Sequence, residues 1–291
     1  MTDRTLVCWN GTDAAEAALG WALRRSRDAG SRLELVDVVD ATLFVGDHVA
    51  LERAIEEEQD RLMARVELLE QTHPAALARH ELIVGDPLEM LSLQTVPDTL
   101  VVVGTRRRTG LLIRYGWSIG ARLATSASGP VAIVPADTAA DNGGAGTGVV
   151  VGVDGSEISG LALAFAADEA ASLDLPLTIV HCWQAPLAGE PLVVPDDEFV
   201  GSQETAHREL LDEHVRFTRE RHPRLAIASS LLRRDPIAGL TGASAGAFMV
   251  VVGSRRLTGW KRAWLGSVSH GLALGIPAPT VIVGPETAAR S

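Results

Sequence analysis

The chain has 291 residues, of which 46% are hydrophobic and 22% charged, and its formal net charge is −11. Such a length is long for one hydrophobic core and sufficient for two. An acidic chain is a poor partner for nucleic acid, because phosphate backbones attract a basic surface. No segment reaches the roughly 18 apolar residues of a membrane span, and the first residues lack the basic start and apolar run of a signal peptide. We therefore expect a cytoplasmic protein with neither a nucleic-acid nor a membrane partner.

Apolar, β-branched segments alternate with helical patterns along the chain. The first half contains strand patterns at residues 6–10, 33–39, 81–84, 100–104 and 131–135. The second half contains them at 148–154, 175–183, 227–232, 247–253 and 279–284, with helices predicted at 155–173, 204–222, 236–246 and 267–274. Ser156 is expected to cap the first of these helices, and Pro236 to begin the third. Strands that are apolar throughout predict a parallel sheet covered on both faces.

The second half of the chain repeats the first. The segment VVVGTRRRTGLLIRYGWS, from Val101, aligns with VVVGSRRLTGWKRAWLGS, from Val250, at a spacing of 149 residues. Nearer the start of each copy, residues 9–12 align with residues 153–156 at a spacing of 144. The second copy therefore holds five extra residues, the difference between 149 and 144, which we place in a surface loop around residues 188–201.

The repeat predicts two modules joined by a linker. The segment DTAADNGGAGTG is small, polar and rich in glycine, as is typical of flexible linkers. We predict a first module over residues 1–137, a linker over 138–147 and a second module over 148–291. Each module is α/β and is expected to form a doubly wound, five-stranded parallel sheet. Ligands of such sheets bind beyond the carboxyl ends of the strands, where the strand order reverses.

In the second module, glycine and polar residues follow two of the predicted strands. Asp154 and Ser156 follow the first strand, Gly253 ends the fourth, and Gly266 and Ser267 stand at a predicted helix start. Backbone N–H groups of such a segment can bind a phosphate, because glycine permits close approach. The alternative is structural, with Gly253 as a strand-end turn and Gly266 and Ser267 as a capping pair. The residues themselves leave both interpretations open.

Together these landmarks resemble tandem universal stress proteins over nearly all of the chain, through VVVGVDGSEISGLAL, the Asp235-Pro236 pair and VVVGSRRLTGWKRAWLGSVS. The resemblance implies an adenine nucleotide alpha hydrolase-like fold and, as in ATP-binding members, a loop of the form G-x2-G-x9-G-[S/T]. The ligand implied is ATP or a related adenine nucleotide, with Mg²⁺. The nucleotide-binding residues implied are Asp154 near the ribose and adenine, Cys182 beside the adenine, and Gly253, Arg256, Gly266, Ser267 and Val268 around the phosphates.

Both modules depart from that loop pattern. Arg256 stands at the second glycine, where its side chain either pairs with phosphate or narrows the loop. In the first module the corresponding positions hold Asn10, Gly104, Arg107, Trp117 and Ser118. Trp117 conflicts sterically with a phosphate at a helix start. We therefore expect the first site to be degenerate and empty.

For most of the remaining polar and aromatic residues we expect structural roles. The basic clusters at residues 106–108, 255–256 and 261–262 are either solvated loops or anion ligands. Cys8 and Cys182 are expected to be buried thiols and His181 a packed, hydrogen-bonded side chain, while His207, His214 and His222 share a wetted helix face. We expect Trp183, Trp260 and Trp264 to fill a core or an interface. No catalytic constellation or metal cluster stands out, which favours binding over catalysis.

The last predicted strand of each module, VAIVP and TVIVG, is apolar. The family resemblance implies that this strand lies at a sheet edge, and an unprotected apolar edge favours pairing. We expect the modules to form an intramolecular pseudo-dimer with two-fold symmetry, and a homodimer of whole chains stays open.

Three functions are compatible with the sequence. The leading hypothesis is a non-catalytic stress-response or regulatory protein that binds ATP or a related nucleotide in the second module. The first alternative is a nucleotide-free interaction scaffold with two vestigial sites, and the second is a slow ATPase.

Overall fold

The computed structural model describes residues 4–106, 119–137, 146–184, 197–254 and 278–286. Several predicted features lie outside the described residues: Arg107, Trp117, Ser118, Arg256, Gly266, Ser267, Val268, the helix expected at 267–274 and most of the linker.

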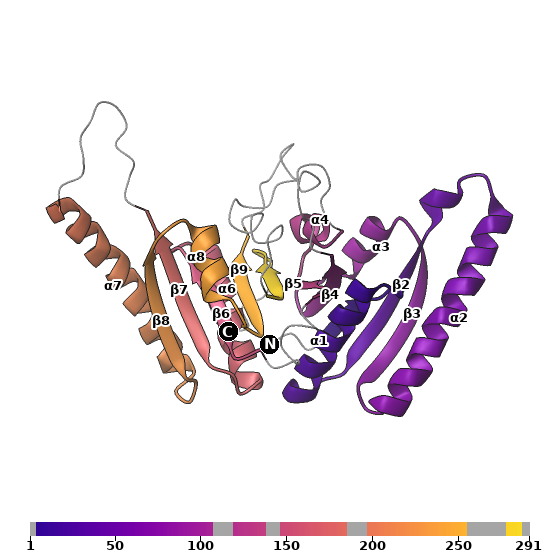
Figure 1. Cartoon of the computed structure of the whole chain (residues 1–291), viewed down its shortest axis with the longest axis horizontal. Coiled ribbons are helices and arrows are strands. Elements are labelled where there is room, and N and C mark those ends of the chain that lie inside the picture. The colour runs from indigo at the N-terminus through magenta and orange to yellow at the C-terminus, as the bar shows by residue number, and fades with distance from the viewer. Residues whose placement is uncertain (1–3, 107–118, 138–145, 185–196, 255–277, 287–291) are drawn as a thin grey trace.

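The described strands form one ten-stranded sheet in the order β3-β2-β1-β4-β5-β10-β9-β6-β7-β8 (Figure 1). The first module contributes β1 (Arg4–Cys8), β2 (Leu33–Asp40), β3 (Leu77–Gly85), β4 (Thr99–Thr105) and β5 (Val131–Pro135). The second contributes β6 (Val149–Val153), β7 (Leu177–Trp183), β8 (Ile227–Arg233), β9 (Met249–Gly253) and β10 (Thr280–Val283). Neighbouring strands within each module are parallel, which confirms the predicted doubly wound sheets.

Helices cover both faces of this sheet. One face carries α1 (Asp13–Ala29), α2 (His48–Thr72), α6 (Glu157–Ser172) and α7 (Asp197–Arg221). The other carries α3 (Pro87–Gln94), α4 (Ile119–Ser126) and α8 (Pro236–Ala243), and a short 3-10 helix, η1 (Ala41–Phe44), follows β2. The core between these layers is built mainly from Val, Leu and Ala side chains.

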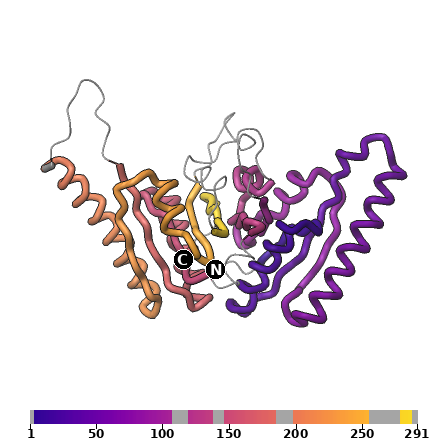
Figure 2. The backbone as a smooth tube through the Cα atoms, in the orientation of Figure 1, coloured from indigo at the N-terminus to yellow at the C-terminus, as the bar shows by residue number. Residues whose placement is uncertain are grey.

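The modules meet at β5 and β10, which pair antiparallel with Ala132 opposite Val281. Every other strand pair in the sheet is parallel, so the strand direction reverses once, at this junction. The two halves spread outward from it, with α2 and α7 at opposite ends of the molecule (Figure 2).

Local signals in the sequence set the helix starts. Thr12 and Ser156 each accept a hydrogen bond at 3.3 Å from the backbone N–H three residues later, which confirms Ser156 as an N-cap. Asp86 and Asp235 cap α3 and α8 in the same way, each followed by a proline in the first turn.

Two expectations about the elements need correction. α7 begins at Asp197, seven residues before the predicted start at Glu204, so part of the loop expected around 188–201 is helical. The strands are not apolar throughout: β3 and β8 are partly exposed along most of their length. They lie at the outer edges of the sheet, where a strand has a neighbour on one side only.

Candidate functional site

The strand order of the second module reverses between β6 and β9, and the chain leaves β6 through a tight polar turn. Asp154 Oδ1 accepts hydrogen bonds from the Ser156 backbone N–H at 2.9 Å and from Ser156 Oγ at 2.5 Å. Gly155 adopts a left-handed conformation with φ of 81°, and Ser156 caps α6. The turn therefore holds an exposed carboxylate beside the positive end of a helix.

The first module keeps the same turn without the charge. Asn10 Oδ1 accepts from Thr12 Oγ1 at 2.8 Å, and Gly11 has φ of 71°. An amide oxygen thus replaces the carboxylate at the matching position, while the backbone is unchanged. The degeneracy of the first site stays a prediction, and Trp117 lies outside the described residues.

Gly253, the last residue of β9, and Gly104, the last but one of β4, each lie against the first turn of a helix. A Cβ at Gly253 would lie 2.8 Å from the Ile158 carbonyl oxygen, and one at Gly104 would lie 2.0 Å from the Ala14 carbonyl oxygen. Real Cβ contacts do not approach a backbone atom so closely. Helix packing alone therefore requires a glycine at both positions. This holds in the second module, which keeps more of the phosphate-loop pattern, and equally in the first, which keeps less of it.

Cys182 lies on β7 and its sulfur packs against α8. A Cβ at Gly239 would lie 2.5 Å from Cys182 Sγ. Burial raises the pKa of the Cys182 thiol, with a further contribution from Asp235 that Arg234 opposes. Cys182 and Cys8 are both free and half-buried, and burial raises the pKa of Cys8 to about 12. Both thiols therefore stay protonated near neutral pH and suit packing better than nucleophilic chemistry.

The remaining predicted nucleotide-binding residues, Arg256, Gly266, Ser267 and Val268, lie outside the described residues. Of the basic clusters, Arg106 is described: its side chain is 69% exposed, and its guanidinium lies 3.8 Å from the Asp13 carboxylate.

The sequence analysis missed a ring cluster at the carboxyl end of β7. His181 is buried, as expected, and its Nδ1 donates to the Val153 carbonyl oxygen at 2.7 Å. His181 Nε2 is then left to accept from His207 Nδ1 at 2.8 Å. Trp183 stacks on His207 at 5.0 Å, and the Arg233 guanidinium lies 5.5 Å from the Trp183 ring centroid.

The wetted histidine face predicted for this helix is wrong, because these side chains turn toward the protein. His207 contacts β7, and His214 Nε2 is buried with no hydrogen-bond partner among the described residues. His222 lies 3.4 Å from Asp168 on α6. Burial lowers the pKa of both His207 and His214.

The first module holds two carboxyl groups where the second holds two imidazoles. Asp37 aligns with His181 at the 144-residue spacing, and Glu58 aligns with His207 at the 149-residue spacing. Asp37 is 2% exposed. Burial, with help from Glu58, raises the pKa of Asp37 to about 7. A sequence signal for these two clusters was available: Asp37 and His181 are titratable residues at the same repeat position of two apolar strands.

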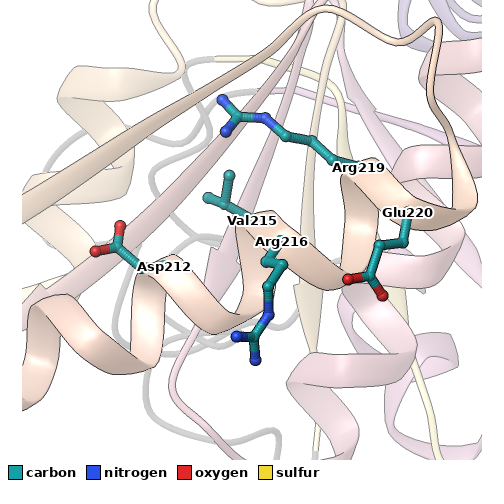
Figure 3. Close-up of a pocket in the computed structure, with 5 residues that line it drawn as sticks. All are labelled: Asp212, Val215, Arg216, Arg219 and Glu220. Atoms are coloured by element: carbon teal, nitrogen blue, oxygen red, sulfur yellow. The ribbon is translucent and has the colours of Figure 1, made fainter.

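A surface hollow of about 380 Å³ lies along the C-terminal half of α7 (Figure 3). Its lining residues, Asp212, Val215, Arg216, Arg219 and Glu220, all come from this one helix. Their charges are mixed and they point in several directions, so they form no convergent site (Figure 3).

Membrane spans and metal sites are both absent from the described part of the chain. None of its helices is long and apolar enough to cross a membrane. The same residues contain no cluster of three or more side chains suited to a metal ion.

The fold and the turn together define a tandem of two doubly wound α/β modules with one acidic and one neutral strand-end turn. The model of the universal stress protein family matches residues 1–135 and again residues 147–284. The chain therefore belongs to the universal stress protein family, as the sequence resemblance implied.

Known relatives match over most of the chain. Universal stress protein Rv2005c of Mycobacterium tuberculosis is 30% identical over 70% of this chain and 68% of its own length. A universal stress protein of Mycolicibacterium smegmatis is 29% identical over 97% of both chains.

Solved structures agree on the fold. A universal stress protein of Archaeoglobus fulgidus aligns with 98% of this chain and 99% of its own, with a TM-score of 0.69 and 15% identity. Two others, solved in complex with dAMP and with cAMP, cover 47% and 50% of this chain at TM-scores of 0.33 and 0.35. These scores are too low to carry an argument about the site of this chain.

Proposed function

We propose that the second module binds ATP or a related adenine nucleotide, with Mg²⁺, and that the chain is a non-catalytic regulator in a stress response. The observation that supports this most directly is the turn after β6. It holds the exposed Asp154 carboxylate beside the N-terminus of α6, at the point where the strand order reverses. Ligands of doubly wound sheets bind at such points.

Each proposed residue has a distinct task. Asp154 would accept hydrogen bonds from the ribose hydroxyls or the adenine amine, with its orientation fixed by Ser156. Cys182, a protonated thiol, would contact the adenine. The phosphates would lie among Gly253, Arg256, Gly266, Ser267 and Val268, where the Arg256 guanidinium supplies charge. Mg²⁺ would accompany the phosphates rather than occupy a protein site.

Calorimetry tests the proposal with variants taken from the first module. Wild type is expected to bind ATP and Mg²⁺ at one site per chain. Gly266→Trp, which copies Trp117, should abolish binding. Asp154→Asn, which copies Asn10 and keeps the turn, should weaken binding by about tenfold, equivalent to about 1.4 kcal/mol for a charged hydrogen bond.

Asn10→Ala in the first module is the matched control and should leave the affinity unchanged. Binding that survives Gly266→Trp, or that Asn10→Ala weakens as much as Asp154→Asn does, would contradict the assignment.

A nucleotide-free scaffold is the second candidate, and the packing of Gly253 favours it. Since the Ile158 backbone alone requires that glycine, its presence does not depend on a phosphate. In this case millimolar ATP would leave the melting temperature of the wild-type protein unchanged. A rise of several degrees, as mass action predicts for a ligand of the folded state, would exclude the scaffold.

Two further parts of the proposal have their own tests. If the protein is non-catalytic, the wild type should release phosphate from ATP no faster than the Asp154→Ala variant does. A slow ATPase would instead release phosphate in the wild type and lose that activity in the variant. A cytoplasmic location is tested by fractionation of cells that express the protein.

We also propose that the two modules pair within one chain in solution. The β5–β10 ladder supports this, because it buries the apolar edge strand of each module. Light scattering should then report one chain per particle. A particle of two chains would show either that modules pair between chains or that whole chains assemble further.

A further inference from the structure

A buried ion pair joins the two modules. Arg25 on α1 donates to Glu169 on α6 through two bonds of 2.6 Å, from Nε to Oε2 and from Nη2 to Oε1. Both side chains are 0% exposed. Arg25 Nη1 also donates to Thr5 Oγ1 at 2.7 Å. The forked geometry matches guanidinium to carboxylate and satisfies the charge of each without water.

The two partners occupy the same position of the repeat. The spacing of 144 that aligns the helix caps Thr12 and Ser156 also aligns Arg25 with Glu169. A residue that meets its own counterpart across an interface lies on the two-fold axis that relates the two halves.

The strand junction marks the same axis independently. In the β5–β10 ladder Ala132 lies opposite Val281, and these residues are counterparts at the spacing of 149. Both side chains belong to the core on the face that carries α1 and α6. One pseudo-two-fold axis therefore passes through the Ala132–Val281 pair and through the Arg25–Glu169 pair above it.

On the two-fold axis of a symmetric dimer, a charged residue contacts its own copy in the other subunit, which carries the same charge. We propose that Arg25 and Glu169 form a charge code that makes module pairing heterotypic, so that the dimerisation face of the first module accepts the second module and rejects another copy of itself. A pair of first modules would bury two guanidinium groups against each other, and a pair of second modules two carboxylates. Like charges without water are strongly unfavourable, so the code rejects both homotypic pairs, and the complement at the highest effective concentration is the second module of the same chain.

An aromatic contact at the same interface has the same asymmetry. Trp21 stacks on Phe248 with ring centroids 5.5 Å apart, and its Nε1 donates to the Phe248 carbonyl oxygen at 3.0 Å. The counterparts of these residues in the repeat are Phe165 and Thr99. A pair of two first modules would therefore set Trp21 against Thr99 and lose the ring contact.

Charge reversal in the full-length chain tests the code. Arg25→Glu and Glu169→Arg each bury two like charges and are expected to lower the melting temperature by about 5–10 °C. The double variant R25E/E169R restores opposite charges and should recover most of that loss. As a control, the exposed pair Glu204–Arg208 on α7 should shift the melting temperature by less than about 2 °C when either charge is reversed.

A mixing experiment separates pairing specificity from stability. R25E carries glutamate at both axis positions and E169R carries arginine at both, so each module of one chain finds its complement only in the other. After joint unfolding and refolding, native mass spectrometry should detect a particle with one chain of each variant. Wild type mixed with the double variant should remain single chains, because each already closes within itself.

Two results would overturn the proposal. One is a double variant as unstable as the weaker single variant, which would mean that charge complementarity does not govern this position. The other is the absence of the mixed R25E–E169R particle under conditions where the double variant refolds. Nucleotide binding enters neither measurement, so failure here leaves the proposed ligand untouched.

Discussion

Asp37 and His181 show how one repeat position acquires opposite chemistry in two modules. Each lies near the carboxyl end of a second strand and is almost fully buried. Asp37 resides near the Glu58 carboxyl, and His181 binds the His207 ring. Two carboxyl groups at close range favour a shared proton, whereas two imidazoles in a hydrogen bond need at least one neutral ring. Burial raises the pKa of Asp37 and lowers the pKa of His207, so folding favours the protonated form of the first group and the neutral form of the second.

The carboxyl pair gives a pH-dependent prediction. Burial raises the pKa of Asp37 to about 7, from about 4 in the unfolded chain. Between these values the folded state binds more protons, so this residue's contribution to stability falls as the pH rises from 4 to 7. Asp37→Asn removes that loss and should raise the free energy of unfolding at pH 8 by at least about 1 kcal/mol.

Urea titrations at a series of pH values provide the measurement. Asp60→Asn, at an exposed position on α2, the helix that carries Glu58, is the control and should leave the pH profile unchanged. If Asp37→Asn keeps the wild-type slope between pH 4 and 7, the buried carboxyl does not titrate in this range.

Among the elements, β4 and β9 each end against the backbone of a helix. For β4 this is α1, which follows the neighbouring strand β1, and for β9 it is α6, which follows the neighbouring strand β6. Gly104 meets the Ala14 carbonyl oxygen and Gly253 meets the Ile158 carbonyl oxygen, so the first turns of α1 and α6 lie directly on the strand ends. The strand patterns were readable from the sequence. The reason for the glycines was not, because residues about 90 positions apart in the chain make these contacts.

A glycine variant tests this packing at the scale of the element. Gly104→Ala forces α1 away from β4 and should lower the free energy of unfolding by about 2–3 kcal/mol. Gly160→Ala in α6, where an added Cβ meets nothing within 4 Å, should instead raise it by about 0.5–1 kcal/mol. Chemical denaturation measures both, and equal effects of the two substitutions would refute the packing argument.

For the whole molecule, the apolar core on the α1 and α6 face is continuous across the module boundary. Leu100 and Val102 of the first module belong to the same buried cluster as Val149 and Val151 of the second. The buried ion pair and the Trp21–Phe248 contact lie at that boundary. An interface of this kind couples the two modules energetically, since separating them exposes core side chains and two charges.

This coupling predicts one cooperative unfolding transition for the full chain, although most multi-domain proteins unfold in steps. Tryptophan fluorescence and far-ultraviolet circular dichroism should give coincident urea curves. Trp21→Ala, which removes the ring contact across the boundary, should lower the common midpoint. Two separate transitions in the wild-type protein would show that the modules unfold independently.

The sequence by itself determined the repeat, the alternation of strands and helices, the helix cap at Ser156, the helix start at Pro236, and the acidic turn at Asp154. These features are local, because hydrophobic periodicity and turn chemistry act over a few neighbouring residues. The resemblance added the family, and the family match confirmed it. The phosphate loop stays a prediction from that resemblance.

Only the tertiary structure decided which repeat positions meet. Arg25 and Glu169 read as ordinary charged helix residues, yet docking of the modules buries both on one axis. The histidines of α7 read as a solvated face, yet the helix turns them toward β7 and α6. Charge and spacing along the chain do not determine burial, which depends on how segments 144 residues apart pack against each other. The physical difference is the range of the interaction: caps and turns act within one segment, whereas desolvation of a charge requires the whole fold.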